Sequence, residues 1–463
     1  MALGRVYAKL PVLAQHGAVS AYGVYWYWQR FGPGFRSAFA EFQARERWSA
    51  QAWAAWQRTA LTAVLSDAAA HVPYYRRTWT VAEKRAAAAG ELGDIPLLTK
   101  EPLRADPLAF LDERVPRRGL ITSPTSGSTG TPISVLWRTR ELRRSMALRE
   151  ARLANWAGVS FRQRRATFSG RMVEPDPRSA GPFYRFNAVE RQVYFSPFHL
   201  RADTAPHYVE ALRRHRVAWM TGYAVSFYLL ASFMLDLGLP PVPTVKAVVT
   251  TSEKVTAPMR ATIERAFACP VFEEYSTVDN VLFASECEHR HLHVSPDVGV
   301  VEILRPDGRP CLAGEVGEVV ATGVMRVGQP FVRFRLGDLA AWSDEACACG
   351  RAMPILAEVS GRVEDVVIGP DGRQMVRFHG VFVDQPRVRE GQIVQEALDR
   401  IRVKVVTTPD FSAVDRRTIV ERVQQRLGPD VHVEVEVVAS IPRSAAGKFQ
   451  AVVSHVRSGP AAP

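Results

Sequence analysis

The sequence predicts an α/β protein built from two domains, a large N-terminal domain of residues 1–364 and a small α+β domain of residues 365–463. Three observations support this fold class. The chain has 463 residues, which is more than one hydrophobic core usually holds. Residues 90–360 alternate helical and short β-like segments, a pattern typical of layered sheets and helices. The C-terminal part has a β-α-β pattern of its own.

Residues 1–90 are predicted to be mainly helical. Alanine-rich periodic segments cover residues 38–44 and 50–70, and His71-Val-Pro-Tyr-Tyr75 then interrupts the helical pattern because proline breaks a helix. Further along the chain, the pattern predicts a strand at residues 246–250 and a helix at 257–268, and then short strands at 298–304, 318–322 and 331–334.

The C-terminal part is predicted to contain a strand at residues 402–407, a helix at 413–427 and a second strand at 431–438. The helix has Ile419, Val423 and Leu427 on one face, and Gly428 follows as its stop signal.

The composition is that of a soluble globular protein, with 47% hydrophobic and 23% charged residues. The formal net charge is +12, and such a charge can indicate a nucleic-acid or membrane partner. Only seven of the 59 cationic residues are lysines, and the arginines are scattered along the chain. We therefore expect no nucleic-acid partner, while an anionic small substrate would profit from the positive field.

The five cysteines are too few and too unevenly spaced for a disulfide scaffold. The sequence contains no evident signal peptide and no segment apolar enough to span a membrane. We expect a cytoplasmic protein and leave a homodimer open. The apolar residues 12–28 end in the cluster Tyr22-Gly-Val-Tyr-Trp-Tyr-Trp28, which we expect to pack against the protein itself; a membrane surface or a partner is the alternative.

A loop rich in small polar residues is the most informative segment. It reads Thr125-Ser-Gly-Ser-Thr-Gly-Thr-Pro132 and lies between the apolar segments 119–121 and 133–137. Glycines let backbone amides turn toward an anion, and hydroxyls add hydrogen-bond donors for phosphate oxygens. The alternative is a flexible linker, although linkers rarely lie between buried strands. A Walker-type loop is excluded because no Gly-Lys-Ser/Thr ending is present.

This loop resembles the phosphate-binding signature of the adenylate-forming superfamily. Its amino-acid sequence is similar to that of the phenylacetate–CoA ligase branch, which includes capsular-polysaccharide-type relatives. Further similar motifs follow in the family's order. They are Tyr275-Ser-Thr-Val-Asp279, Pro330-Phe-Val-Arg-Phe-Arg-Leu-Gly-Asp338, Gly361-Arg-Val-Glu-Asp365 and Ile441-Pro-Arg-Ser-Ala-Ala-Gly-Lys448. Two positions depart from the family pattern, since Ser276 replaces glycine and Asp279 replaces glutamate.

The resemblance implies roles for individual residues. Lys448 is the expected catalytic residue, because a lysine offsets the negative charge that develops when a carboxylate attacks the α-phosphate. Asp279 is expected to hold magnesium, and Glu364 or Asp365 to be the hinge of the small domain. The residues expected to bind ATP or AMP are Thr125, Ser126, Gly127, Ser128, Thr129, Gly130, Ser252, Glu253, Glu274, Tyr275, Ser276, Asp338 and Arg362.

The segment Thr221-Gly-Tyr-Ala-Val-Ser226 resembles the branch's element near the acyl pocket. From it and from the residue after Asp279, we expect the substrate pocket to be lined by Tyr223, Val225, Ser226, Phe227 and Asn280.

A metal site is also predicted. Cys287 is followed by His289, His291 and His293, and Cys347-Ala-Cys349 comes later; three thiolates and one imidazole form a common structural zinc set. The resemblance selects His293 and implies that Cys287, His293, Cys347 and Cys349 hold zinc. The alternative is a set of buried free cysteines beside a polar loop.

The sequence thus predicts a ligase that uses ATP and Mg²⁺ to convert a carboxylic acid, aromatic by the branch resemblance, into an acyl-AMP. The expected acceptor of the acyl group is coenzyme A. One alternative is transfer to an amine or hydroxyl in a biosynthetic pathway, forming an amide or ester. Another is a catalytically idle scaffold that binds no ATP.

Overall fold

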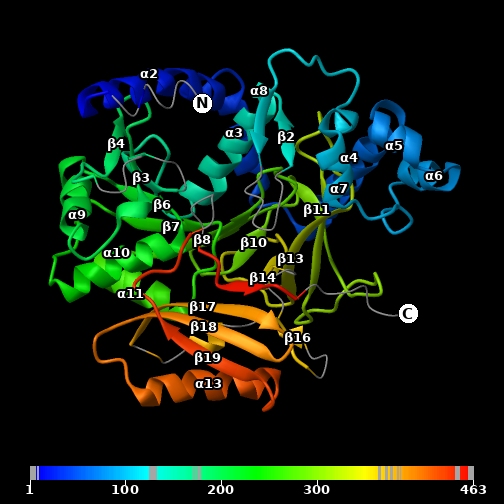
Figure 1. The fold of residues 1–463 in the computed structure, drawn as a ribbon. Coiled ribbons are helices and arrows are strands. Elements are labelled where there is room, and N and C mark those ends of the chain that lie inside the picture. The colour runs from blue at the N-terminus through cyan, green and yellow to red at the C-terminus, as the bar shows by residue number, and fades with distance from the viewer. Residues whose placement is uncertain are drawn as a thin grey trace.

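A computed structural model describes residues 7, 10–124, 133–169, 173–174, 179–362, 367–370, 374–375, 379–382, 385, 387–443 and 449–456. These residues form a large body up to Arg362 and a smaller C-terminal unit, drawn in orange and red at the bottom of Figure 1. The predicted α/β fold class is confirmed.

Helices dominate the N-terminal part, as predicted. They are α2 (Val12–Phe31), α3 (Phe35–Arg45), α4 (Ala50–His71), α5 (Pro73–Thr78), α6 (Val81–Ala89), α7 (Lys100–Ala105) and the short η1 (Pro107–Phe110). Local sequence determines several of their ends. The Ser49 side chain caps α4, whose last residue His71 precedes Pro73, and Thr80 and Glu83 form a capping box at α6.

A twelve-stranded sheet forms the centre of the large body. Its strand order is β11 (Gly299–Leu304), β12 (Gly317–Gly323), β13 (Phe334–Ser343), β14 (Ile355–Arg362), β10 (Leu292–Val294), β9 (Phe283–Glu286), β8 (Val271–Ser276), β7 (Ala247–Thr251), β6 (Trp219–Gly222), β3 (Arg165–Phe168), β5 (Gln192–Phe195) and β4 (Tyr184–Asn187). The strands from β8 to β5 pair in parallel, and the strands on either side of this group pair antiparallel.

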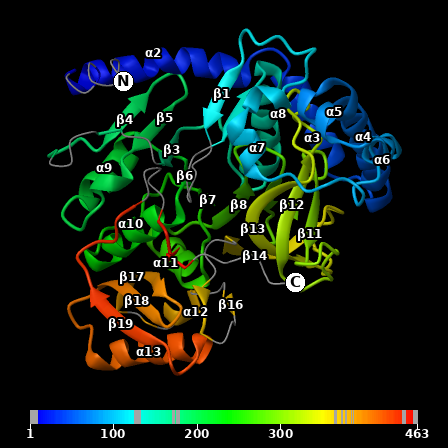
Figure 2. The same cartoon turned by 45° about the vertical axis from the view of Figure 1, so that its right-hand side comes forward.

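Helices cover both faces of the parallel strands because successive side chains point to opposite faces. Met220 and Val248 join a core with α9 (Ala205–Arg214), α10 (Ala224–Asp236) and α11 (Ala257–Phe267). Their neighbours Trp219 and Val249 join the core of the other face, with α3 and α8 (Thr139–Leu148). Figure 2 shows the helices on the two sides of the sheet.

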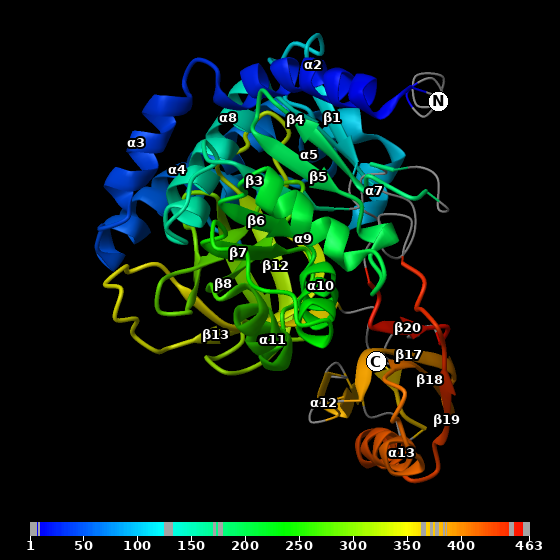
Figure 3. The same ribbon diagram turned by 90° about the vertical axis from the view of Figure 1, so that its left-hand side faces the viewer.

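The C-terminal unit has a four-stranded sheet in the order β19 (His432–Val437), β18 (Arg400–Thr407), β17 (Val388–Ala397) and β20 (Val452–Ser454). The predicted helix is α13 (Ala413–Leu427), and Ile419, Val423 and Leu427 are fully buried on its inner face. The short elements β15 (Val367–Ile368), β16 (Gln374–Met375) and α12 (His379–Phe382) precede this sheet. Figure 3 shows the unit set apart below the large body.

Two expectations were wrong. The strand expected at residues 331–334 begins only at Phe334, because Phe331 packs against Phe110 in the core and Arg333 has a left-handed φ of 46°. Most of the aromatic cluster of α2 is not covered by the body: Tyr22 and Trp28 are 61% and 59% exposed, and Trp28 contacts the body through Arg143, which lies over its ring. Among the described residues, no helix is long and apolar enough to cross a membrane.

Candidate active site

The carboxyl ends of β6, β7 and β8 lie side by side at one edge of the sheet. The register pairs Gly222 with Thr250, and Thr251 with Glu274, so the residues that follow each strand are neighbours. β5 and β6 lie on opposite sides of β3, so the strand order reverses between β3 and β6 at this edge. Ligands of α/β proteins bind at such points, outside the carboxyl ends of the strands.

Tyr275 and Asp338 come together at this edge, from β8 and β13. The Tyr275 hydroxyl donates a hydrogen bond of 2.9 Å to Oδ2 of Asp338, whose side chain is buried. The backbone of Arg362 lies opposite Asp338 in the pairing of β13 with β14. Three residues expected at the nucleotide are therefore neighbours, although the Arg362 side chain lies outside the described part of the chain.

The buried carboxylate of Glu274 is neutralised by Arg149, with which it forms an ion pair. Arg149 also donates to the Ser276 hydroxyl at 3.2 Å, and that hydroxyl donates to Glu274 at 2.6 Å. Arg149 begins η2 (Arg149–Ala154), a single π-helical turn, and such turns often occur at functional sites. The three side chains therefore form one closed polar group beside Tyr275.

Asp279 lies in the loop between β8 and β9 and is only 4% exposed. Its Oδ1 accepts hydrogen bonds from the Thr277 hydroxyl and, at 3.4 Å, from the Val281 amide. Burial raises the pKa of Asp279 above its usual range. Its assignment as a magnesium ligand stays a prediction.

Arg326 contacts residues within or beside three of the predicted motifs, although it belongs to none of them. Its buried guanidinium donates at 2.7 Å to the Asp279 carbonyl oxygen and at 3.1 Å to the Leu136 carbonyl oxygen. It also lies over the ring of Phe331, 4.8 Å from its centre. One side chain thus connects the segments that contain Asp279, Phe331 and the strand after the Ser/Thr/Gly loop.

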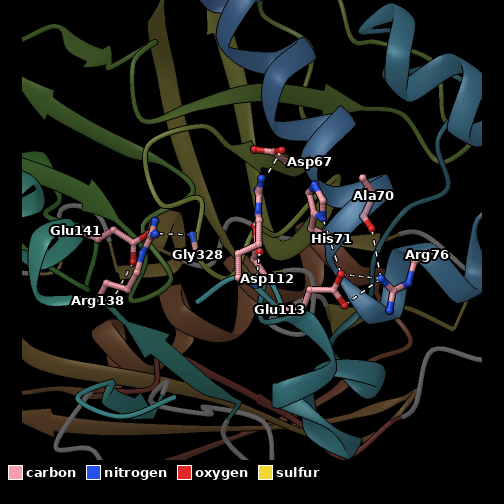
Figure 4. Close-up of polar contacts among 10 residues, drawn as sticks. Asp67, Ala70, His71, Arg76, Asp112, Glu113, Arg138, Glu141 and Gly328 are labelled. Carbon is pink, nitrogen blue, oxygen red and sulfur yellow. Dashed lines mark hydrogen bonds and ion pairs between the residues drawn. The ribbon is translucent and has the colours of Figure 1, made fainter. Parts of the chain in front are cut away.

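That strand is β2 (Ser134–Trp137), which pairs antiparallel with β1 (Ile121–Pro124). Residues 125–132, and with them the six expected phosphate-binding residues, lie outside the described residues. The end of β2 is held firmly, because Arg138 pairs with Glu141, and Glu141 accepts from the Gly328 amide at 2.8 Å (Figure 4). The strand that follows the loop in sequence is therefore fixed on the large body.

Ser252 and Glu253 form the turn after β7. Ser252 has a left-handed φ of 68°, a conformation that costs free energy in a residue other than glycine and often marks a functional site. The Glu253 carboxylate connects two parts of the protein. One oxygen accepts from the Val225 amide in the first turn of α10 at 3.0 Å, and the other accepts from the Phe449 amide of the C-terminal unit at 2.8 Å.

The segment around Phe449 is also held from its own unit. Arg443 forms a bidentate ion pair with the buried Glu390, at 2.6 and 3.1 Å, and lies over the ring of Phe449. Lys448 precedes Phe449 directly and lies outside the described residues, as do the expected hinge residues Glu364 and Asp365.

The expected pocket residues differ in their surroundings. Phe227 and Tyr223 are buried at the start of α10, and Phe227 packs against Phe168 in the core. Ser226 is buried beside them, and Val225 is partly exposed. Asn280 is 1% exposed; its Oδ1 accepts from Ser145, while its Nδ2 has no protein partner among the described residues.

The four residues expected to hold zinc come together. Their ligand atoms all lie within 4.8 Å of one another, and the Sγ atoms of Cys287 and Cys347 are 3.6 Å apart. A tetrahedral zinc site with Zn–S bonds of about 2.3 Å has S···S edges of about 3.8 Å. The donor set and its spacing therefore fit a structural zinc ion.

The surroundings also suit a metal centre. His293 directs Nε2 to the Cys349 Sγ at 3.3 Å and Nδ1 to the Met353 carbonyl at 3.2 Å, the second contact that orients a metal-binding imidazole. Burial lowers the pKa of His293 to about 4, so the ring is neutral at pH 7. Trp53 and Trp156 shield the cluster.

The sequence analysis missed Arg149, Arg326 and Glu390. Each is an ordinary charged residue at the sequence level, and the only signal that could have found it is its position within an otherwise buried segment. Their importance comes from partners that are distant in sequence.

Comparisons with known proteins agree with this geometry. The CapK C-terminal domain family matches residues 370–455. Protein CapK of Staphylococcus aureus is 23% identical over 379 residues, which cover 79% of this chain and 81% of that protein. The phenylacetate-coenzyme A ligase of Thermus thermophilus is 27% identical over 197 residues, covering 37% of this chain and 44% of the ligase.

Among solved structures, 2-hydroxyisobutyryl-CoA ligase in the postadenylation state with 2-HIB-AMP superimposes with a TM-score of 0.69, at 22% identity, covering 89% of this chain and 91% of that one. The comparisons confirm the predicted resemblance to adenylate-forming ligases, with a phenylacetate-coenzyme A ligase among the relatives.

Substitution of Arg326 by methionine should destabilise the protein, because the carbonyl oxygens of Asp279 and Leu136 lose their buried donor. Each unsatisfied group costs about 1–3 kcal/mol, so we expect the free energy of unfolding to fall by roughly 2–5 kcal/mol. Urea denaturation measures the change. The matched control is Arg309→Met, whose ion pair with Asp307 is exposed and whose effect should stay within about 0.5 kcal/mol. Equal effects of both substitutions would contradict the role of Arg326.

Proposed function

We propose that the protein is an ATP-dependent ligase that converts a small carboxylic acid into an acyl-AMP and then transfers the acyl group to an acceptor, which is coenzyme A. The observation that carries this proposal is the Glu253 carboxylate, which joins the start of α10 to Phe449, the residue after Lys448. Consecutive Cα atoms are about 3.8 Å apart. The contact holds Phe449, the residue after Lys448, at the turn after β7, and this supports the assignment of Lys448 to the reaction.

In the first step, an oxygen of the substrate carboxylate attacks the α-phosphorus of ATP, and pyrophosphate leaves. We assign to Lys448 the stabilisation of the negative charge that develops between these groups. Asp338, held by Tyr275, would accept hydrogen bonds from the ribose hydroxyls. The loop of residues 125–132 would hold the phosphates, and Asp279 would hold a magnesium ion that neutralises their charge.

We further propose that the acid is aromatic and that its pocket includes Tyr223, Val225, Ser226, Phe227 and Asn280. Support comes from the buried, apolar start of α10. Transfer to an amine or hydroxyl would use the same first step, so the product of the second step separates it from thioester formation.

The small unit would turn about Glu364 or Asp365 between the two steps, with the domain boundary between residues 364 and 365. The comparisons support a first-step arrangement of the two parts. The TM-score to 2-hydroxyisobutyryl-CoA ligase is 0.69 for its postadenylation state and 0.54 for its thioesterification state. The contact between Glu253 and Phe449 would then belong to the first step.

We also propose that Cys287, His293, Cys347 and Cys349 hold a structural zinc ion. Four protein ligands leave no open position, so the ion would join the loops after β9 and β13 to β10 without taking part in the reaction.

Pyrophosphate release with ATP, Mg²⁺ and a panel of aryl and alkyl acids tests the proposed activity. We expect release that depends on the acid, and a loss of about 10²–10³ in rate for Lys448→Ala. Lys404→Ala, which removes another lysine of the same unit, is the control and should keep full activity. Product analysis with coenzyme A then tests for a thioester. If no pyrophosphate is released and calorimetry detects no ATP binding, the result would contradict the proposed activity and favour the alternative of a catalytically idle scaffold.

Glu253→Gln tests the role of the Glu253 carboxylate as a positioning group. Glutamine keeps one acceptor oxygen, so the amide of Val225 or of Phe449 loses its partner. We expect kcat for pyrophosphate release to fall about ten- to hundredfold, with a smaller change in KM for ATP. Asp236→Asn breaks the exposed contact between Asp236 and Arg389 of the small unit and should have little effect. A raised KM with unchanged kcat would instead make Glu253 a nucleotide ligand.

Metal analysis tests the zinc site. The purified protein should contain one zinc per chain, and Cys349→Ser should reduce that content and lower the melting temperature. Cys269→Ser is the control, because Cys269 lies outside the cluster among buried side chains; it should keep the zinc. A metal content that does not differ between the two variants would refute the assignment.

A further inference from the structure

The outward face of α2 is apolar over its whole length. Of the seventeen large hydrophobic side chains that are exposed in the described part of the chain, six lie on this helix. They are Leu13, Tyr22, Val24, Tyr25, Tyr27 and Trp28, with exposed fractions from 45% to 84%. Small residues fill the rest of this face, at Ala14, Gly17, Ala18 and Ala21. An uncovered apolar surface of this kind marks an interaction site.

The polar residues of α2 point inward, which is the reverse of a normal surface helix. Each has a partner in the body of the protein. Gln15 accepts a hydrogen bond from Arg185, and Gln29 accepts one from Thr139 at 2.7 Å. His16 and Ser20 accept hydrogen bonds from the amides of Phe186 and Ala188, at 2.9 and 3.0 Å. Arg30 forms an ion pair with Glu190 at 2.8 Å. The helix therefore cannot hide its apolar face without losing all of these contacts.

Close packing also fixes the helix on the body. Gly23 faces β4, and a Cβ atom at this position would lie 2.4 Å from Oδ1 of Asn187. In Figures 1 to 3, α2 runs along the edge of the large body on the side opposite the C-terminal unit. The apolar face is thus rigid, peripheral and remote from the small unit that would move during the reaction.

The sequence of α2 and its flanks carries positive charge only. The first forty residues contain no aspartate or glutamate, and their four cations are Arg5, Lys9, Arg30 and Arg36. Among the described cations, Arg30 is paired with Glu190, and Arg36 is exposed just beyond the end of α2. An apolar stripe rich in tyrosine and tryptophan, with an exposed arginine nearby and no acid of its own, complements the boundary of an anionic lipid bilayer, where such aromatic residues concentrate.

The size of the face distinguishes a bilayer from a second protein chain. A helix of 20 residues is about 30 Å long, so a stripe about 10 Å wide offers on the order of 300 Å². A stable protein–protein interface buries about 800 Å² on each partner. The stripe is therefore too small for a stable dimer, whereas a helix that lies in the lipid headgroup region needs only its own apolar face.

We propose that the outward face of α2 docks the protein on the surface of an anionic membrane, with Tyr22, Tyr25 and Trp28 inserted among the lipid headgroups. The helix would lie in the plane of the membrane, and the C-terminal unit would face away from it. This inference is independent of the proposed ligase activity.

Co-sedimentation of the full-length protein with vesicles tests the proposal. We expect binding to mixed phosphatidylcholine–phosphatidylglycerol vesicles and weak binding to phosphatidylcholine alone. Combined substitution Tyr22→Ser, Tyr25→Ser and Trp28→Ser should lower the bound fraction about tenfold or more. A rise from 0.1 M to 1 M salt should also weaken binding, because the Debye length falls from about 10 Å to about 3 Å.

The matched control combines Val81→Ser, Leu312→Ser and Val414→Ser, three exposed hydrophobic residues on other surfaces, and should bind like the unmodified protein. Urea denaturation should give equal stabilities for both triple variants. Equal binding by both variants would overturn the proposal. So would a lack of vesicle binding by the unmodified protein, and sedimentation velocity would then show whether α2 instead mediates self-association that the Tyr22, Tyr25 and Trp28 substitutions abolish.

Discussion

The buried guanidinium of Arg326 is the interaction on which the candidate site depends. Arg326 connects the loop that carries Asp279 with strand β2, and the carbonyl groups it binds there are removed from water. Arg326 satisfies the carbonyl oxygens of Asp279 and Leu136 and packs between Trp137 and Phe331. A planar group with several fixed donors can hold such segments in one geometry, which a flexible lysine could not do equally well.

Around this anchor, the site consists of carboxylates that already accept hydrogen bonds from fixed partners. Glu274 has Arg149, Asp338 has Tyr275, and Glu253 accepts amides from two parts of the chain. Side chains held in this way need little reorganisation when a charged substrate binds. The contact between Glu253 and Phe449 also makes the geometry dependent on the position of the small unit, which suits a two-step reaction on one site.

Much of the fold could be predicted from the sequence, because local signals determine it. Proline ended α4, the capping residues began α6 and α13, and the period of Ile419, Val423 and Leu427 correctly predicted the inner face of α13. The prediction failed where a side chain's surroundings come from distant segments. The aromatic residues of α2 were expected to be buried because they are apolar, yet Gln15, Ser20 and Arg30 have better partners in the body.

By itself, the sequence determined the fold class, the resemblance to adenylate-forming ligases and the four residues that could hold a metal, because these depend on residue types in a fixed order along the chain. Tertiary structure alone decided that Cys287, His293, Cys347 and Cys349 meet, that Arg149 neutralises Glu274 and that α2 turns its apolar face outward. The physical reason is that burial and charge pairing depend on which segments the sheet brings together. No local pattern records that information.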